Sequence, residues 1–183
     1  MTTLIAFALL AGGDSSFICP VMGNKADDGK VIYYAGFKSK ICCGGCDSAF
    51  TKTPVKYLTE GASKGVVAEF MFDPISHGAP KASADIQTST YKGVRYLFES
   101  AANKAAFDKS PAKFAVSFPS KEVLVCPIAG EAISSPKAAA GFADVKGVRY
   151  YVCCPDCLGK LMKDPAGSVA KLKDKVKPAA AGK

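Results

Sequence analysis

The feature that most constrains this chain is a threefold internal repeat. Gly36, Gly93 and Gly147 each lie in a similar phrase, with a bulky apolar residue and then a proline at matching distances downstream. The second and third glycines are both followed by Val-Arg-Tyr, and a Cys-Pro or Asp-Pro phrase opens every copy. The sequence therefore predicts three copies of one small unit.

The pattern within a copy predicts a β-hairpin followed by a short helix. Aromatic and β-branched residues alternate on both sides of an Ala-Gly or Lys-Gly turn, which is typical of a hairpin. A helix is expected to begin near the second cysteine of Cys43-Gly-Gly-Cys46 and of Cys154-Pro-Asp-Cys157, where Pro155 and Asp156 suit a first helical turn. The expected apolar face of that helix in the third copy consists of Leu158, Leu161 and Met162.

We therefore expect an α+β chain of three tandem treble-clef-like modules, each with a knuckle, a β-hairpin and a short helix. The modules are predicted over residues 17–59, 68–118 and 122–165, with a Lys/Ala-rich, solvated and mobile tail over 166–183. The linkers are expected at Thr59–Val67 and at Phe118–Lys121.

Residues 1–13 are apolar and end in small residues, as in a secretory signal peptide, although the basic n-region is missing. This predicts a periplasmic or secreted protein, and the alternative is a buried first element of a cytoplasmic protein. No apolar run approaches the roughly 18 residues that a membrane-spanning helix needs, so no span is expected in the mature chain.

Charge and composition argue against several classes of function. The formal net charge is +8, but residues 160–183 hold seven of the lysines, and the chain has only two arginines. Because nucleic-acid recognition favours arginine, no nucleic-acid partner is expected. The single histidine, His77, is expected at the surface. No acid–base pair, phosphate loop or activated nucleophile is visible, so we expect no enzyme activity.

All eight cysteines lie in the first and third copies, in matching places. They are Cys19, Cys42, Cys43 and Cys46, and Cys126, Cys153, Cys154 and Cys157. A cysteine on a knuckle and further cysteines at a strand-to-helix junction are typical of thiolate metal sites. Because neighbours in a strand point to opposite faces, we favour Cys42 with Cys46 and Cys153 with Cys157 in one site each. Cys43 and Cys154 are possible fourth ligands.

The sequence predicts about one thiophilic ion, Zn²⁺ or Cu⁺, in each cysteine-containing copy. Met22 is interpreted either as a core residue or as a thioether ligand, and a thioether beside thiolates would favour Cu⁺. A protein partner is not excluded.

The phrase Cys19-Pro-Val-Met-Gly, the Tyr-x-Gly hairpin, the Cys-Cys-x-x-Cys and the Phe-x₃-Pro ending resemble the YHS/TRASH family of treble-clef metal-binding modules. The resemblance covers residues 17–165, and the middle copy is similar to cysteine-free YHS domains through Phe72-Asp-Pro-Ile and Tyr91–Phe98. It implies heavy-metal binding, sensing, trafficking or resistance, often for copper or zinc. The chain departs from related fingers at Met22 and Ala129, where a second knuckle cysteine is common.

The middle copy has Glu99, Ser100 and Asn103 where the other copies have cysteines. A unit of this size often needs a metal or disulfide staple, yet this copy dispenses with one. Two interpretations of the metal therefore stay open, a structural zinc staple and active metal handling.

Two other classes of function remain as alternatives. The C-x-x-C spacing of Cys43–Cys46 and Cys154–Cys157 is also that of thiol–disulfide redox proteins. In an exported chain, oxidation would form structural disulfides such as Cys19 to Cys42 or Cys46. A structural or protein-interaction module stapled by zinc or disulfides is the remaining hypothesis.

Overall fold

The structure is a computed structural model that describes residues 16–83 and 86–182. The fold is mixed α+β, with 34% helix and 28% strand, and it contains two sheets. Residues 1–13, where the sequence predicts a signal peptide, lie outside the described residues. In the part of the chain that the structure describes, no helix has both the length and the apolar character needed to cross a membrane.

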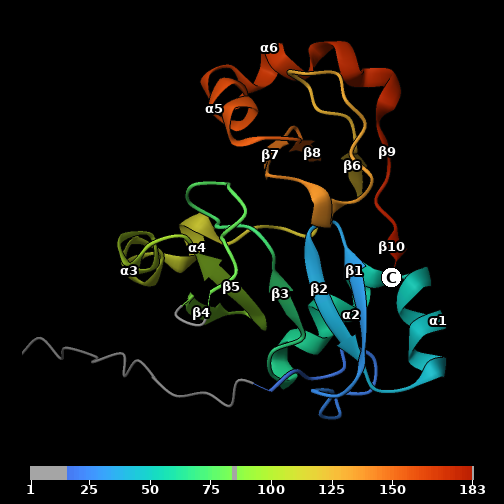
Figure 1. The fold of residues 1–183 in the computed structure, drawn as a ribbon. Coiled ribbons are helices and arrows are strands. Elements are labelled where there is room, and N and C mark those ends of the chain that lie inside the picture. The colour runs from blue at the N-terminus through green and yellow to red at the C-terminus, as the bar shows by residue number, and fades with distance from the viewer. Residues whose placement is uncertain (1–15, 84–85, 183) are drawn as a thin grey trace, which may run out of the picture.

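The three repeats fold as three similar units, each a hairpin followed by two short helices (Figure 1). The first unit contains β1 (Lys30–Tyr34), β2 (Phe37–Ile41), α1 (Gly44–Lys52), α2 (Pro54–Gly61) and η1 (Ala62–Lys64). The second contains β4 (Gln87–Tyr91), β5 (Val94–Phe98), α3 (Ala101–Lys109) and α4 (Pro111–Phe114). The third contains η2 (Pro136–Ala138), β7 (Gly141–Val145), β8 (Val148–Val152), α5 (Pro155–Lys163), α6 (Pro165–Val169) and η3 (Ala170–Lys175). Strands β3 (Ala68–Phe70) and β6 (Lys121–Val123) precede the second and third units, and β9 (Lys177–Pro178) and β10 (Ala181–Gly182) follow the third.

Each hairpin turns through two residues with positive φ. The φ angles are 46° and 83° at Ala35-Gly36, 47° and 71° at Lys92-Gly93, and 51° and 76° at Lys146-Gly147. Two successive positive values define a type I′ turn, whose twist matches that of the strands, and glycine adopts such angles without a Cβ clash. The hairpins predicted around the three glycines are confirmed.

The strands that precede the second and third units join those units in the same way. Strand β3 runs parallel to β5, with Glu69 opposite Arg95, and β6 runs parallel to β8, with Glu122 opposite Arg149. Because β3 also pairs with β2, the first and second units share one sheet, ordered β10-β1-β2-β3-β5-β4. The third unit has its own sheet, ordered β7-β8-β6-β9.

The three units pack around one hydrophobic core. Phe70, on β3, has its ring centroid 4.7 Å from that of Phe37 in the first unit and 5.0 Å from that of Phe142 in the third. The predicted linker Phe118–Lys121 takes part in this packing, since the Tyr34 hydroxyl donates a hydrogen bond to the carbonyl of Pro119 at 2.7 Å. The units are therefore parts of one body and not separate beads.

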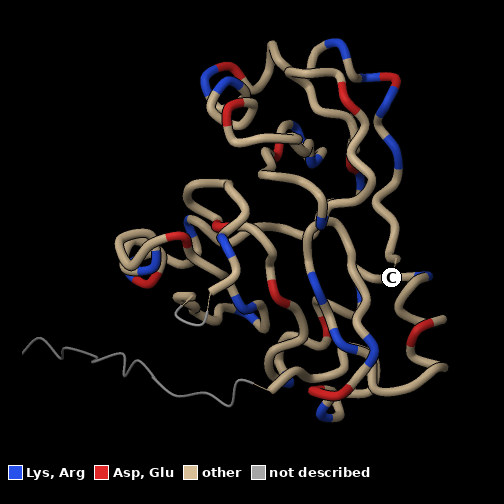
Figure 2. The backbone as a smooth tube through the Cα atoms, in the orientation of Figure 1, with Lys and Arg blue, Asp and Glu red and all other residues tan. Residues whose placement is uncertain are grey.

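The end of the chain differs from the expected mobile tail. Figure 2 shows basic residues along the segment after α5. Helix η3 contains Lys171, Lys173 and Lys175, so the predicted basic character is present. Strand β9 then pairs with β6 of the third unit, and β10 pairs with β1 of the first (Figure 1). Up to Gly182, the expectation of a mobile tail is wrong, because unpaired edges of both sheets bind this segment.

Candidate metal centres

The first ligand of each centre lies on a tight turn. The backbone N–H of Gly23 donates to the carbonyl of Cys19, and that of Gly130 donates to the carbonyl of Cys126, both at 2.8 Å. Both glycines have positive φ, 79° and 74°, which lets the chain reverse directly after the Cys-Pro phrase. The side chains of Cys19 and Cys126 are fully buried by this turn.

The other cysteines lie where a hairpin ends and a helix begins. Cys43 and Cys154 are the N-caps of α1 and α5, and their sulfurs accept the N–H of Cys46 and Cys157 at 3.3 Å. The helices begin at Gly44 and Pro155, beside the cysteines, as predicted. This cap places the third cysteine of each group in the first helical turn, facing back toward the hairpin.

These turns and caps bring together two matching groups of three sulfurs. Cys19, Cys42 and Cys46 form one triad, and Cys126, Cys153 and Cys157 form the other, with ligand atoms within 4.8 Å of one another in each. The Cys42–Cys46 and Cys153–Cys157 sulfurs are 3.9 Å apart, the pairing that the sequence favoured. Three sulfurs at this separation are positioned to bind a metal ion.

Each triad has an enclosed side and an open side. The knuckle and helix cysteines are buried, whereas the strand-end cysteines, Cys42 and Cys153, are half-buried. An ion held by the three sulfurs would therefore be approached from the side of the strand end without unfolding of the knuckle or the helix.

The cysteines of each triad differ in the direction of their pKa shifts. Burial acts to raise the pKa of Cys19, but backbone N–H groups of Cys42, Met22 and Val21 aimed at its sulfur bring that pKa below the ordinary value. Cys126 likewise has a lowered pKa: burial opposes ionisation, and N–H groups that include that of Ala129 outweigh it. Within each triad, the knuckle cysteine is therefore the one that loses its proton most readily when a cation binds.

The remaining triad thiols hold their protons more tightly. Hydrogen bonding to Cys126 raises the pKa of Cys153 to about 11, and the carboxylate of Glu131 adds a smaller rise. Hydrogen bonding to Cys19 raises the pKa of Cys42 in the same way. Glu131 was missed by the sequence analysis; its only signal is its place five residues after Cys126, where the first copy has Asn24.

The cysteines considered as fourth ligands lie outside the triads, at the caps. Cys43 is joined to Cys46 in a disulfide, whereas Cys154 and Cys157 are free thiols. This disulfide joins the C-x-x-C pair named in the redox alternative, and it differs from the structural disulfides of Cys19 with Cys42 or Cys46 that were given as examples for an exported chain. Until it is reduced, Cys46 cannot serve as a thiolate ligand.

Met22 does not have the core position that was one of its two interpretations. Its side chain is 59% exposed, on the turn that follows Cys19. The same turn in the third copy carries Ala129, so the exposed thioether belongs to the first centre alone.

The middle copy holds the same junction together with hydrogen bonds. Asp73 replaces the knuckle cysteine and is fully buried, and its carboxylate accepts the N–H groups of Ile75 and Glu99 at 2.8 Å. The side-chain amide of Asn103, which replaces the helix cysteine, donates to the same carboxylate at 2.7 Å. Ser100 caps α3 just as Cys43 and Cys154 cap α1 and α5. An aspartate thus ties knuckle to helix where the other copies present thiols.

His77 is not the surface residue that the sequence predicted. Its ring is half-buried and stacks on Phe142 of the third unit, with the centroids 4.8 Å apart. It lies on the metal-free knuckle and belongs to neither triad.

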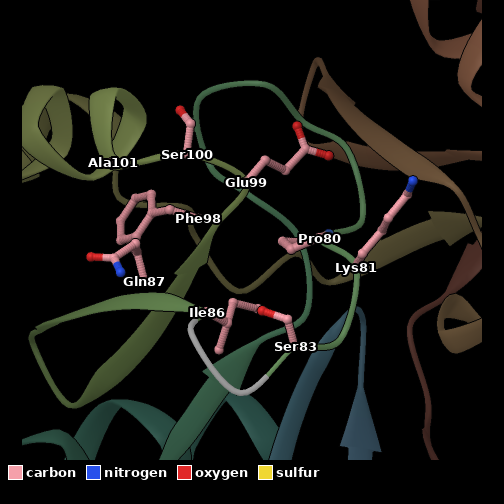
Figure 3. A pocket seen from close by; sticks show the side chains of 9 residues that line it. All are labelled: Pro80, Lys81, Ser83, Ile86, Gln87, Phe98, Glu99, Ser100 and Ala101. Carbon is pink, nitrogen blue, oxygen red and sulfur yellow. The ribbon is translucent and has the colours of Figure 1, made fainter.

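A pocket of about 540 Å³ lies over the start of α3 in the middle copy (Figure 3). Lys81, Glu99 and Ser100 are among its polar lining residues, and all three are exposed. The polar side chains that the structure describes around this pocket are all exposed to solvent, so the pocket offers a weaker case for a specific site than the triads.

Comparisons with protein-family models, with curated proteins and with solved structures found no match. The interpretation of the site therefore depends on its geometry. Three sulfurs per centre, two of them buried and one accessible, provide soft ligands with an open approach, and this set suits Zn²⁺ or Cu⁺ far better than Mg²⁺ or Ca²⁺.

Proposed function

We propose that this protein binds one thiophilic metal ion in each triad and holds it exchangeably, in heavy-metal trafficking, sensing or resistance. The observation that carries the proposal is the pair of three-sulfur centres, each open on the side of Cys42 or Cys153. Coordination displaces the thiol protons, and the knuckle cysteine, whose pKa is lowered, loses its proton to the incoming ion most readily.

The middle copy favours an exchangeable bound ion over a structural one. Its knuckle and helix are joined through Asp73 and Asn103 without any thiol, so this junction does not need an ion to form. The three units also share a core and a paired C-terminal segment. The fold therefore has other sources of stability than bound metal, which small zinc domains lack.

The ligand number also favours an exchangeable ion. Structural zinc sites are almost always closed by four protein ligands, whereas a three-ligand site leaves a position for water or an incoming ligand. Three thiolates without a hard oxygen donor equally suit Cu⁺. The exposed Met22 thioether lies near the first centre on the knuckle turn and would add a soft donor there.

The YHS/TRASH resemblance supports the same proposal through its motifs, and we propose membership of that family on those residues. Under this proposal the chemistry is coordination and transfer of an ion, not catalysis. The exposed faces of the two centres are where a protein partner would exchange the ion.

Metal content and thiol accessibility test the proposal together. The reduced chain, loaded anaerobically with Zn²⁺ or Cu⁺ and desalted, is expected to retain one ion per triad by elemental analysis. Cys19→Ser and Cys126→Ser are each expected to remove one ion, because each variant deletes one triad thiol. Cys43→Ser and Cys154→Ser are the matched controls and are expected to keep both.

The same samples distinguish an exchangeable ion from one that the fold needs for stability. Removal of the ions by a chelator is expected to leave the far-ultraviolet circular dichroism spectrum and the cooperative unfolding transition in place. Collapse of the fold on metal removal would establish a structural role, and a reduced chain that retains no ion would overturn metal binding altogether.

A further inference from the structure

Each centre contains a second pair of cysteines that overlaps the triad by one residue. Cys46 and Cys157 belong to the triads, and each is also paired with the cap cysteine three residues before it. The first pair, Cys43–Cys46, is a disulfide, and the second, Cys154–Cys157, is a dithiol. The same local fold thus accommodates both oxidation states.

We propose that Cys43 and Cys154 are redox partners of the metal ligands Cys46 and Cys157, and that oxidation of these pairs by a disulfide releases the bound ion. This inference rests on the proposed function of the triads. A sulfur committed to a disulfide no longer offers the thiolate that a metal ion requires. Only two of the three ligands then remain.

Burial assigns the two cysteines of each pair different roles. Cys43 is exposed and Cys154 is half-exposed, whereas Cys46 and Cys157 are buried beneath them. An oxidant arriving from solvent therefore meets the cap sulfur first. The buried ligand lies within reach of that sulfur and completes the exchange.

The need for a helix N-cap does not by itself explain why Cys43 and Cys154 are cysteines. Ser100 has the same position in the middle copy and accepts the N–H of Asn103 at 3.1 Å, so a hydroxyl is sufficient as a cap. This position is a cysteine in the two copies that have a triad and a serine in the copy that has none. The sulfur is thus present only where there is a metal ligand with which it can form a disulfide.

The reaction is a two-step thiol–disulfide exchange. The Cys154 thiolate attacks a low-molecular-weight disulfide, R–S–S–R, forming a mixed disulfide and expelling one R–S⁻. The Cys157 thiolate leaves the metal and attacks the Cys154 sulfur, expelling a second R–S⁻ and forming the intramolecular disulfide. The two electrons lost by the cysteine pair reduce the oxidant, and the ion departs. Two equivalents of a low-molecular-weight thiol, R–SH, reduce the disulfide by the reverse exchange, form R–S–S–R and restore the triad.

Zinc release under oxidised glutathione tests this mechanism. The reduced chain is first loaded with Zn²⁺ and desalted, and release is then followed with a chromogenic zinc chelator. The double variant Cys43→Ser and Cys154→Ser keeps both triads and has the cap that Ser100 already provides in this chain. Its circular dichroism spectrum verifies the fold.

We expect the wild type to release zinc as the Cys43–Cys46 and Cys154–Cys157 disulfides appear by mass spectrometry. The double variant is expected to release zinc at least about tenfold more slowly, because the nearby resolving partner is gone. Cys42→Ser with Cys153→Ser is the reciprocal control; it removes triad ligands, weakens loading and still forms both disulfides.

Equal release rates in the wild type and the double variant would overturn the inference, as would oxidation between triad cysteines alone. Failure of the proposed function has a different signature, since the reduced wild type would then retain no zinc before any oxidant is added.

Discussion

At the scale of single residues, His77 joins the metal-free knuckle to the third unit. It occupies the turn position of Gly23 and Gly130 and shares their positive φ, 65° in this case, which few side chains adopt. Its carbonyl accepts the N–H of Phe142 at 3.0 Å, and its ring stacks on the same residue. The strained backbone is held in place by this contact with the third unit.

The burial of His77 predicts a depressed pKa. Desolvation lowers its pKa below 6.5; a hydrogen bond to the Phe142 backbone and the charges of Asp144 and Asp73 oppose this, and Arg149 adds to it. The folded state therefore stays neutral while the unfolded chain takes up a proton, so stability falls as the pH drops below 6.5. Because the chain has one histidine, a nuclear magnetic resonance titration of its ring protons measures this directly. A pKa at or above 6.5 would contradict the prediction.

At the scale of the repeated element, the same hairpin–helix junction contains hydrogen-bonded polar side chains in one copy and cysteines in the other two. In the middle copy Asp73 accepts backbone and amide hydrogen bonds, and in the outer copies thiols occupy the corresponding positions. The cap at the helix start is common to all three copies. The geometry of the centre is therefore a property of the repeat, and the side chains decide whether it can take an ion.

This equivalence predicts that a third centre can be built. The triple substitution Asp73→Cys, Glu99→Cys and Asn103→Cys places thiols at the three triad positions and leaves the Ser100 cap unchanged. We expect one additional Zn²⁺ per chain by elemental analysis of the reduced protein. The single change Asp73→Cys is the control and is expected to bind no additional ion. A folded triple variant with unchanged zinc content would refute the equivalence.

At the scale of the whole molecule, Arg149 links the three units. It is fully buried, pairs with Asp144 at 2.7 Å and 2.8 Å, and donates to the carbonyls of Ala35 at 2.6 Å and Ser117 at 3.2 Å. Its guanidinium also lies over the rings of Phe37 in the first unit, Phe142 in the third, and Phe70 on β3, the strand that joins the first and second units. The hydrogen-bond acceptors come from the first unit, the third unit and the segment after α4, so this one side chain contacts all three parts of the molecule.

Replacement of Arg149 is expected to be costly. Arg149→Leu leaves the Asp144 carboxylate and the carbonyls of Ala35 and Ser117 without their donor, and it is expected to lower the free energy of unfolding by about 3–5 kcal/mol. Urea denaturation followed by circular dichroism measures the loss. Lys121→Ala, at an exposed position on β6, is the control and is expected to change stability by less than about 0.5 kcal/mol. Loss of under about 1 kcal/mol on Arg149→Leu would contradict this linking role.

Local features of this molecule were predictable from the sequence, and contacts between units were not. The type I′ turn at Gly147 and the helix start at Pro155 depend on neighbouring residues, and the pairing of Cys153 with Cys157 follows from the same short segment. Burial of Arg149 depends on rings contributed by distant segments, which no local pattern encodes. The same holds for the stacking of His77.

The end of the chain was misjudged for a related reason. An Ala/Lys composition indicates solvation when a segment is considered alone. Here the backbone groups of β9 and β10 pair with strand edges supplied by the first and third units, and backbone pairing needs little from the side chains. The composition of the segment does not reveal the strand edges of β1 and β6, because these edges exist only in the folded molecule.

The pairing of β10 with β1 has a consequence for folding during synthesis. Tyr33 leaves the ribosome well before its partner Gly182, because 148 residues separate them in the sequence. Contacts between such distant positions form late, because the intervening loop has to be closed first. Until β10 has been synthesised, the edge of β1 is open to other nascent chains, and the pairing at Tyr33 and Tyr34 that covers part of this edge forms only afterwards.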